Sequence, residues 1–238
     1  MVEPSARYEE IKIPLLDPVH GLEEVSAVLG IPRWWPTGAR VGVVLAHGSG
    51  SNMNDATLTQ LHRDLTESRF LCLRFNFPFA EANKRRPDEM QVLRRCFRSA
   101  INLLARDPTA AAAHLFLAGK GLGGRVAAEV TISRVRADGL ILMGYPLHPA
   151  SKPDESSAEQ LYRVVSPMLF IQGTRDRYCS VDTLRRTLGR VGAPTALHLV
   201  QEADHQFKVL KKSGRSEEEI GQEILNVTEG WMDKALGS

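Results

Sequence analysis

The sequence predicts an α/β fold with a mostly parallel, eight-stranded sheet that carries helices on both faces. Its 238 residues suit one α/β domain, residues 1–238. Apolar runs of strand length alternate with segments of helical periodicity, which is the pattern of successive βαβ units. Hydrophobic residues make up 43% and charged residues 24% of the chain, as in ordinary folded globular proteins.

The expected elements begin with a hairpin at one edge of the sheet. Residues Arg7–Leu15 and Glu23–Leu29 alternate apolar and polar side chains, as antiparallel strands do. Val41–Ala46 is continuously apolar, so it predicts a central strand covered on both faces. The following elements alternate: helix Ala56–Ser68, strand Phe70–Phe75, helix Pro87–Arg106, strand His114–Ala118, helix Leu122–Arg136, strands Leu140–Met143 and Met168–Gln172, helix Val181–Arg190, strand Ala196–Val200 and helix Glu217–Leu236. Between two of these strands, residues 148–159 suit a mobile flap and are too few for a lid domain.

Composition argues against several classes of function. The formal charge of +2 is too balanced to predict a nucleic-acid or membrane partner. Cys72, Cys96 and Cys179 lack the spacing of metal ligands and are expected to be reduced thiols. Neither a metal nor another cofactor is predicted. The first residues contain no apolar signal segment, which favours a cytoplasmic location.

Three turns that follow strands carry the candidate chemistry, because ligands of open α/β sheets bind at the carboxyl ends of the strands. The first is HGSGSNMND after Val41–Ala46. Its glycines favour a turn whose backbone N–H at Ser49 or Gly50 serves as an oxyanion donor. His47, Gly48 and Gly50 are then expected to line the cleft. The alternative is a tight glycine turn without a catalytic role.

The second turn, Gly119-Lys-Gly-Leu-Gly123, matches G-x-S-x-G except at its centre. In that motif the serine sits on a strained strand-to-helix turn, and the N–H of the next residue completes the oxyanion hole. Gly121 therefore occupies the nucleophile position and Leu122 that of the second donor. Lys120 is expected to line the cleft.

The third turn supplies an acid, and the turn after the next strand supplies a histidine. Asp176 follows Met168–Gln172, and His205 follows Ala196–Val200. The order nucleophile, acid, histidine is that of a Ser-His-Asp triad on such a sheet. Tyr145 and His148, in GYPLHP, are predicted at the mouth of the cleft. Their alternative role is to stiffen a proline-containing loop.

These segments resemble the lid-less α/β-hydrolases related to dienelactone hydrolase. Within them the chain is similar to a branch that includes a testis-expressed hydrolase-like protein and a hydrolase-like subunit of the nonspecific-lethal chromatin complex. The resemblance spans residues 41 to 207 and is carried by LAHGSGSNMN, FLCLRFNFPF, AGKGLGGRVAAE, GLILMGYPLHP, MLFIQGTRDRYC and ADHQF. It implies an esterase-like ancestry, with Asp176 as the orienting acid and His205 as the base. Bacterial relatives carry serine where this chain has Gly121.

Without the serine, hydrolysis of small esters is expected to be absent or very slow. Loss of the nucleophile lowers turnover by about 10⁶-fold in serine hydrolases. A water activated by His205 is one residual route. Ser49, Ser51 and Cys179 are alternative nucleophiles with less suitable positions. The glycine is compatible with a natural loss of activity or with a deliberate inactivation of an active enzyme.

Two further classes use the same residues. Gly119, Gly121 and Gly124 fit the dinucleotide fingerprint G-x-G-x-x-G, although the acidic Asp138 precedes its strand instead of ending it. A binding or scaffold module is the other class, with a basic patch from Lys84–Arg86 and from Arg94, Arg95 and Arg98, or with a solvated helix face there. A small ester or acyl ligand and a protein partner both remain open.

Overall fold

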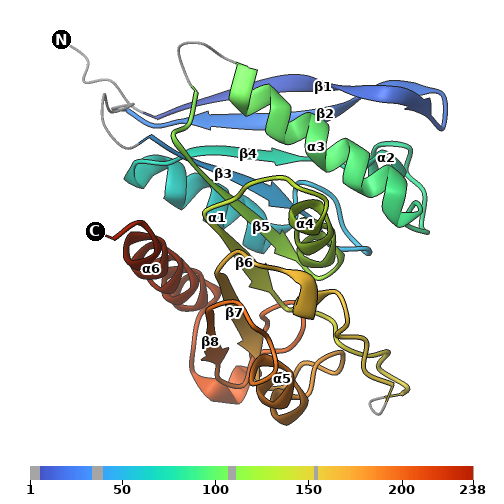
Figure 1. The fold of residues 1–238 in the computed structure, drawn as a ribbon. Coiled ribbons are helices and arrows are strands. Elements are labelled where there is room, and N and C mark those ends of the chain that lie inside the picture. The colour runs from blue at the N-terminus through green and yellow to red at the C-terminus, as the bar shows by residue number, and fades with distance from the viewer. Residues whose placement is uncertain (1–5, 34–39, 107–110, 153–154, 238) are drawn as a thin grey trace.

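The computed structural model describes residues 6–33, 40–106, 111–152 and 155–237. Its strands form one eight-stranded sheet in the order β1-β2-β4-β3-β5-β6-β7-β8 (Figure 1). Neighbours from β4 to β8 are parallel, whereas β1, β2 and β4 pair antiparallel. The strands are β1 (Arg7–Val19), β2 (Leu22–Ile31), β3 (Val41–Ala46), β4 (Leu71–Phe75), β5 (His114–Lys120), β6 (Gly139–Met143), β7 (Met168–Gly173) and β8 (Thr195–Val200).

The predicted edge hairpin is present, and it is longer than the alternating pattern indicated. Its turn is His20-Gly21, with both residues at positive φ. The register of β1 on β2 shifts between Pro14 and Val19, which hides the alternation in that part of β1. The hairpin joins the sheet through Ala27–Gly30, which pair with Cys72–Phe75 of β4.

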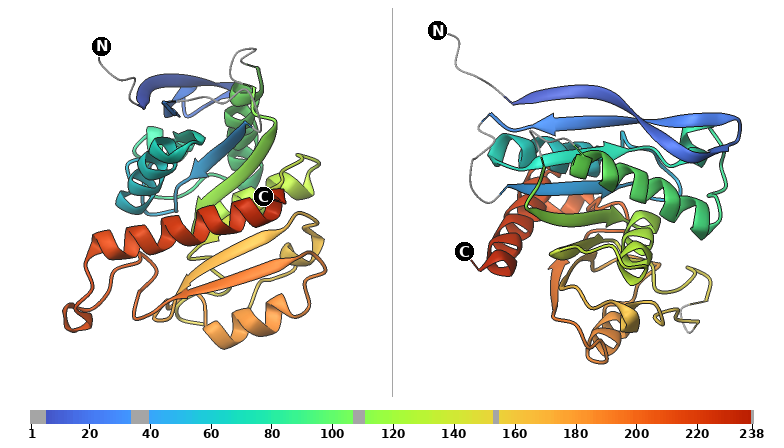
Figure 2. Two further views of the ribbon diagram at one scale, coloured as in Figure 1. Left: turned by 90° about the vertical axis from the view of Figure 1, so that its left-hand side faces the viewer. Right: turned by 45° about the horizontal axis from the view of Figure 1, so that its top comes forward.

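Helices cover both faces of the sheet (Figure 2). On one face lie α3 (Met90–Arg106), α4 (Leu122–Ile132) and α5 (Val181–Leu188), whose apolar side chains share a core with Val44 and Leu117. On the other lie α1 (Ala56–Ser68) and α6 (Glu217–Leu236), which pack with Val43 and Leu45. Consecutive residues of β3 thus enter opposite cores, which explains its uninterrupted apolar run.

Element ends differ from the predictions where local geometry decides them. The helix expected from Pro87 begins at Met90, and a short α2 (Pro78–Glu81) precedes it. The helix expected to reach Arg136 ends at Ile132, because Arg134 adopts a φ of 71°. Two 3₁₀ turns, Leu161–Arg163 and Lys211–Ser213, complete the described elements. The predicted flap includes residues 153–154, which lie outside the described residues.

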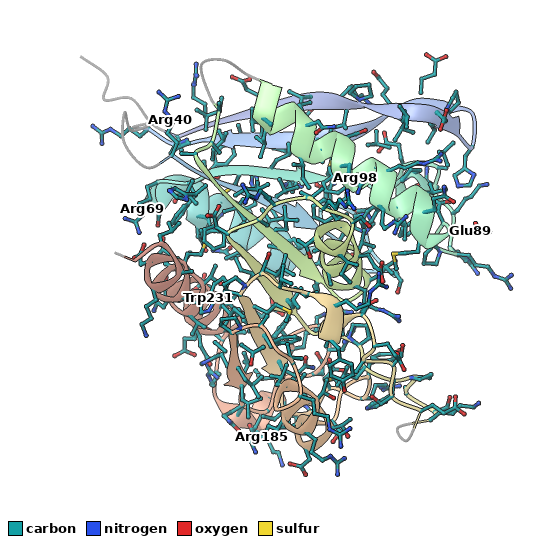
Figure 3. The ribbon with its side chains drawn as sticks, in the orientation of Figure 1. Arg40, Arg69, Glu89, Arg98, Arg185 and Trp231 are labelled. Carbon is teal, nitrogen blue, oxygen red and sulfur yellow. The ribbon has the colours of Figure 1, made fainter. Side chains whose placement is uncertain are left out.

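The arginines of α3 form contacts with neighbouring elements. Arg95 forms an ion pair with Asp17 of β1 at 2.9 Å, and Arg94 lies 3.8 Å from Glu129 of α4. Arg98, labelled on α3 in Figure 3, donates to the carbonyl of Ser133. These contacts connect α3 to the hairpin and to the end of α4.

None of the described helices has the length and apolar character needed to cross a membrane.

Candidate active site

The turn between β5 and α4 has the geometry of a nucleophile elbow. Gly121 adopts φ 55° and ψ −116° and precedes the first residue of α4. A Cβ at Gly119 would lie 2.2 Å from the carbonyl carbon of Gly123, and one at Gly123 would lie 2.2 Å from the carbonyl oxygen of Ala46. The outer glycines are therefore required for close packing of β3, β5 and α4.

An acid and a histidine meet beside this elbow. Asp176, in the turn after β7, is fully buried, and its Oδ2 lies 2.8 Å from Nδ1 of His205 in the turn after β8. The ring of Tyr178 packs on the imidazole with centroids 4.7 Å apart. A Cβ built on Gly121 would lie 3.3 Å from Nε2 of His205. The structure thus brings positions 121, 176 and 205 together.

The orientation of Asp176 depends on Gln172, which the sequence did not reveal as part of the site. The side-chain amide of Gln172 donates to Asp176 Oδ2 at 2.6 Å, and its carbonyl accepts from the N–H of Tyr145 at 3.1 Å. The N–H of Tyr178 donates to Asp176 Oδ1 at 2.8 Å. Because the carboxylate acts as the acceptor in all of these bonds, His205 donates to it from Nδ1. Nε2 is then left to accept a proton. A polar residue inside the apolar strand β7 was the available signal.

A cavity of about 590 Å³ opens at these strand ends. Its wall includes the predicted Gly48, Ser49, Gly50, Lys120, Gly121, Leu122 and His205, and also residues that were not predicted: Ser51, Asp55, Arg125, Pro146, Arg175, Arg177, Tyr178, Asp204 and Gln206. The N–H of Leu122 belongs to the first turn of α4, where backbone donors lack partners within the helix. Such donors beside Gly121 suit a developing oxyanion.

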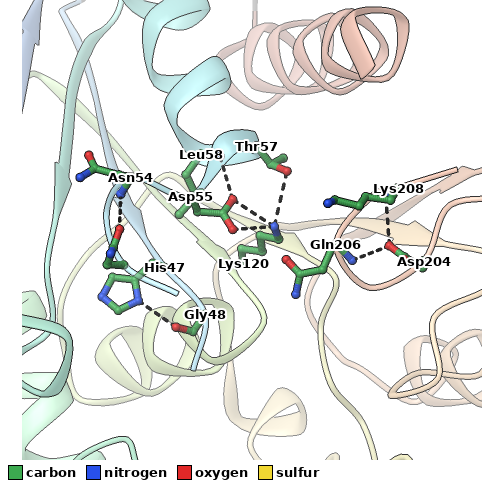
Figure 4. A network of polar contacts seen from close by, with 11 residues as sticks. His47, Gly48, Asn54, Asp55, Thr57, Leu58, Lys120, Asp204, Gln206 and Lys208 are labelled. Atoms are coloured by element: carbon green, nitrogen blue, oxygen red, sulfur yellow. Dashed lines mark hydrogen bonds and ion pairs between the residues drawn. The ribbon is translucent and has the colours of Figure 1, made fainter. Parts of the chain in front are cut away.

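Lys120 lines the cavity as part of a buried ion pair (Figure 4). Its Nζ lies 2.8 and 3.0 Å from the carboxylate oxygens of Asp55 and 3.4 Å from the Thr57 hydroxyl. Only 4% of the Lys120 side chain and 8% of the Asp55 side chain are exposed. Asp55 also caps α1 by accepting from the N–H of Leu58. The pair thereby ties the elbow to the start of α1.

Lys120→Met is expected to lower the free energy of unfolding by about 3–5 kcal/mol, because it leaves a buried carboxylate without its cation. Urea unfolding measures the change. In the control, Lys120→Met is combined with Asp55→Asn, which removes the charge and keeps a capping side chain. The double variant should be more stable than Lys120→Met alone. If the double variant is only as stable as Lys120→Met, or less stable, the two charges do not interact.

Three residues predicted to line the cleft instead support the loops around it. The N–H of Phe77 donates to Nε2 of His47, and that of Ser180 donates to Nε2 of His148. Tyr145 is fully buried and accepts a hydrogen bond from Gln160. These side chains satisfy backbone or buried polar groups, and they are not among the residues that line the cavity. The contacts of Tyr145 and His148 agree with the alternative, in which these residues support the proline-containing loop.

Acidification should destabilise the protein through two buried histidines. Burial lowers the pKa of His47, and likewise that of His62, from 6.5 to about 4. Between pH 6.5 and 4 the unfolded chain binds more protons at these histidines than the folded one. Their contribution to the free energy of unfolding is therefore fully present above this window and is lost as the pH drops through it. Each histidine contributes about 3 kcal/mol to this loss. Urea unfolding at several pH values measures the slope, and His62→Gln should make it shallower. An unchanged slope would contradict the assignment.

The alternative nucleophiles are poorly placed or poorly activated. Cys179 is buried, and burial raises the pKa of its thiol to about 12, which disfavours the reactive thiolate. Ser49 and Ser51 line the cavity, yet among the described residues neither hydroxyl forms a hydrogen bond with His205.

The dinucleotide interpretation fails at Asp138. Its carboxylate accepts from the N–H of Leu115 at 2.7 Å and lies 3.2 Å from Nδ1 of His114, at the beginning of β5. A ribose-binding acid belongs at the opposite, carboxyl end of the next strand. Asp138 therefore holds two strands together far along the sheet from the glycine turn.

Together, the parallel sheet, the elbow and the Asp–His pair at successive strand ends define the class of α/β hydrolases. A family model described as an alpha/beta hydrolase domain matches residues 39–233. The chain belongs to this alpha/beta hydrolase domain family.

Solved structures share the fold at low sequence identity. Dienelactone hydrolase from Anabaena variabilis is 17% identical, with 95% of this chain and 97% of that chain covered and a TM-score of 0.72. A serine hydrolase without a lid from Xanthomonas campestris is 20% identical, with coverages of 94% and 95% and a TM-score of 0.69. Est1E from Butyrivibrio proteoclasticus is 10% identical, with coverages of 96% and 99% and a TM-score of 0.70. These likenesses extend over nearly the whole chain and support a lid-less α/β-hydrolase fold.

Proposed function

We propose that this protein is an esterase-like α/β hydrolase that has lost its nucleophile and retains a ligand-binding cleft. The observation that carries the proposal is the position of Gly121, whose Cβ would stand 3.3 Å from the proton-accepting nitrogen of His205. A serine hydroxyl extends one bond beyond Cβ, so it would reach hydrogen-bond distance of that nitrogen. As the chain stands, ester hydrolysis is absent or very slow.

The surroundings of Gly121 support a cleft that still binds ligands. The Asp176–His205 pair is held by Gln172 and Tyr178, and the cavity opens directly onto it. A small ester or acyl compound is the proposed ligand, without a cofactor. We also propose a cytoplasmic location and a place in the branch of the testis-expressed and nonspecific-lethal hydrolase-like proteins. Recruitment of a protein partner is compatible with such a role.

The test compares three proteins on short-chain p-nitrophenyl esters: the unmodified chain, Gly121→Ser and Gly121→Ala. The alanine variant introduces the same Cβ at the same positive φ, so it isolates the effect of the hydroxyl. Hydrolysis should appear only with serine. Rapid hydrolysis by the unmodified chain would overturn the proposal, and so would an inactive Gly121→Ser variant with a native fold.

A further inference from the structure

We infer that the cavity binds a small organic anion, with a carboxylate or phosphate group held by Arg125, Arg177 and Arg175. This inference deepens the proposed function, because it names the class of ligand for the same cleft. It rests on the charges of the cavity wall and on which of them already have partners.

Both carboxylates of the wall are engaged by the protein itself. Asp55 is neutralised by Lys120 at 2.8 Å. Asp204 accepts from the N–H groups of Gln206 and Lys208 at 2.8 and 3.0 Å (Figure 4). A third carboxylate, Asp176, lies behind His205, fully buried and outside the wall. Asp204 is thus the one carboxylate of the described wall that keeps its negative charge, and it stands against three arginines.

The arginines come from two separate elements and have no acidic partner in the described part of the chain. Arg125 lies in the first turn of α4, while Arg175 and Arg177 flank Asp176 in the turn after β7. Arg175 donates to the carbonyl of Glu202 at 3.2 Å, which fixes its head without neutralising it. The Nε of Arg125 is buried and forms no hydrogen bond with the described residues.

Arg125 is partly buried, and a partly buried cation without a counter-ion is unfavourable, so an anion in the cavity would relieve this cost. Arg175 and Arg177 are exposed and add positive charge at the rim of the same cavity. Guanidinium groups bind carboxylate and phosphate oxygens through parallel N–H donors. The backbone donors at the start of α4 lie on the same wall and favour the same charge. The cavity therefore selects ligands with a negative group over neutral ones of equal size.

The experiment measures binding to the unmodified protein by isothermal titration calorimetry at low salt. Phenyl phosphate and benzoate are the anionic probes, and benzyl alcohol is the neutral control of similar size. At least one anion should bind about tenfold more tightly than the alcohol, and its affinity should fall as salt is raised. The comparison of the two anions tells whether phosphate or carboxylate is preferred.

Variants locate the site. Arg125→Gln and Arg177→Gln should each weaken binding of the preferred anion about fivefold or more. Arg163→Gln, at an exposed position outside the cavity wall, is the matched control and should leave binding unchanged. Circular dichroism verifies that each variant is folded. Equal affinity for benzyl alcohol and both anions would overturn the inference, as would equal losses in Arg163→Gln and the cavity variants.

The inference and the proposed function fail separately. Binding is measured without turnover on the unmodified chain, whereas the proposed function depends on hydrolysis by Gly121→Ser. Anion binding with an inactive Gly121→Ser variant would overturn only the proposed loss of a nucleophile.

Discussion

Gly121→Ser is expected to raise the rate of p-nitrophenyl acetate hydrolysis by roughly 10⁴- to 10⁶-fold over the unmodified protein. The hydroxyl would lie beside Nε2 of His205, which accepts its proton while the N–H of Leu122 faces the developing oxyanion. Initial rates over a range of ester concentrations measure the gain in kcat and in kcat/KM separately.

The same change should reduce stability, because a side chain at the φ of 55° is strained by about 1–3 kcal/mol. Gly121→Ala should show this loss without the gain in rate. If the alanine variant hydrolyses the ester as fast as the serine variant, the new hydroxyl is not the nucleophile.

Asp176→Asn, introduced into Gly121→Ser, is expected to lower the gained kcat by about 10⁴-fold. An asparagine amide facing His205 donates where the carboxylate accepted, so the imidazole is driven to the tautomer that carries its proton on Nε2. Gln172 cannot readily compensate by turning its amide, since its carbonyl already accepts from the N–H of Tyr145. The measurement is kcat across a range of pH.

Asp204→Asn in the same background is the matched control. Asp204 lines the cavity next to His205, but among the described residues its side chain bonds only backbone N–H groups, which an asparagine carbonyl also accepts. Its kcat should remain within a few-fold of that of Gly121→Ser. Equal losses in the two variants would mean that negative charge near the cavity matters, and not the hydrogen bond to Nδ1.

The fold and the three central positions could be predicted because they depend on order along the chain. Alternating strands and helices require a parallel sheet, and parallel strands bring their carboxyl ends to one edge. Gly121, Asp176 and His205 each follow a strand, so the topology alone places them near one another.

The rest of the site depends on contacts between loops that no local pattern encodes. His47 and His148 carry the residue type of a cleft histidine, yet each accepts from a backbone N–H of a distant segment. Lys120 and Asp55 are 65 positions apart, and their pairing is decided by how the turn after β3 meets the elbow. The arginines of the cavity wall were not predicted because a charged residue in a loop or near the start of a helix is ordinarily solvated.

Covalent labelling by a fluorophosphonate tests the central claim most directly, since the reagent reacts with a serine activated by a neighbouring histidine. Intact-mass analysis of Gly121→Ser should show one adduct per chain, mapped by peptide analysis to position 121, while the unmodified protein and Gly121→Ala remain unlabelled. An adduct on the unmodified protein would reveal another nucleophile. A folded Gly121→Ser variant that resists labelling would contradict the assignment of the elbow and its Asp–His pair.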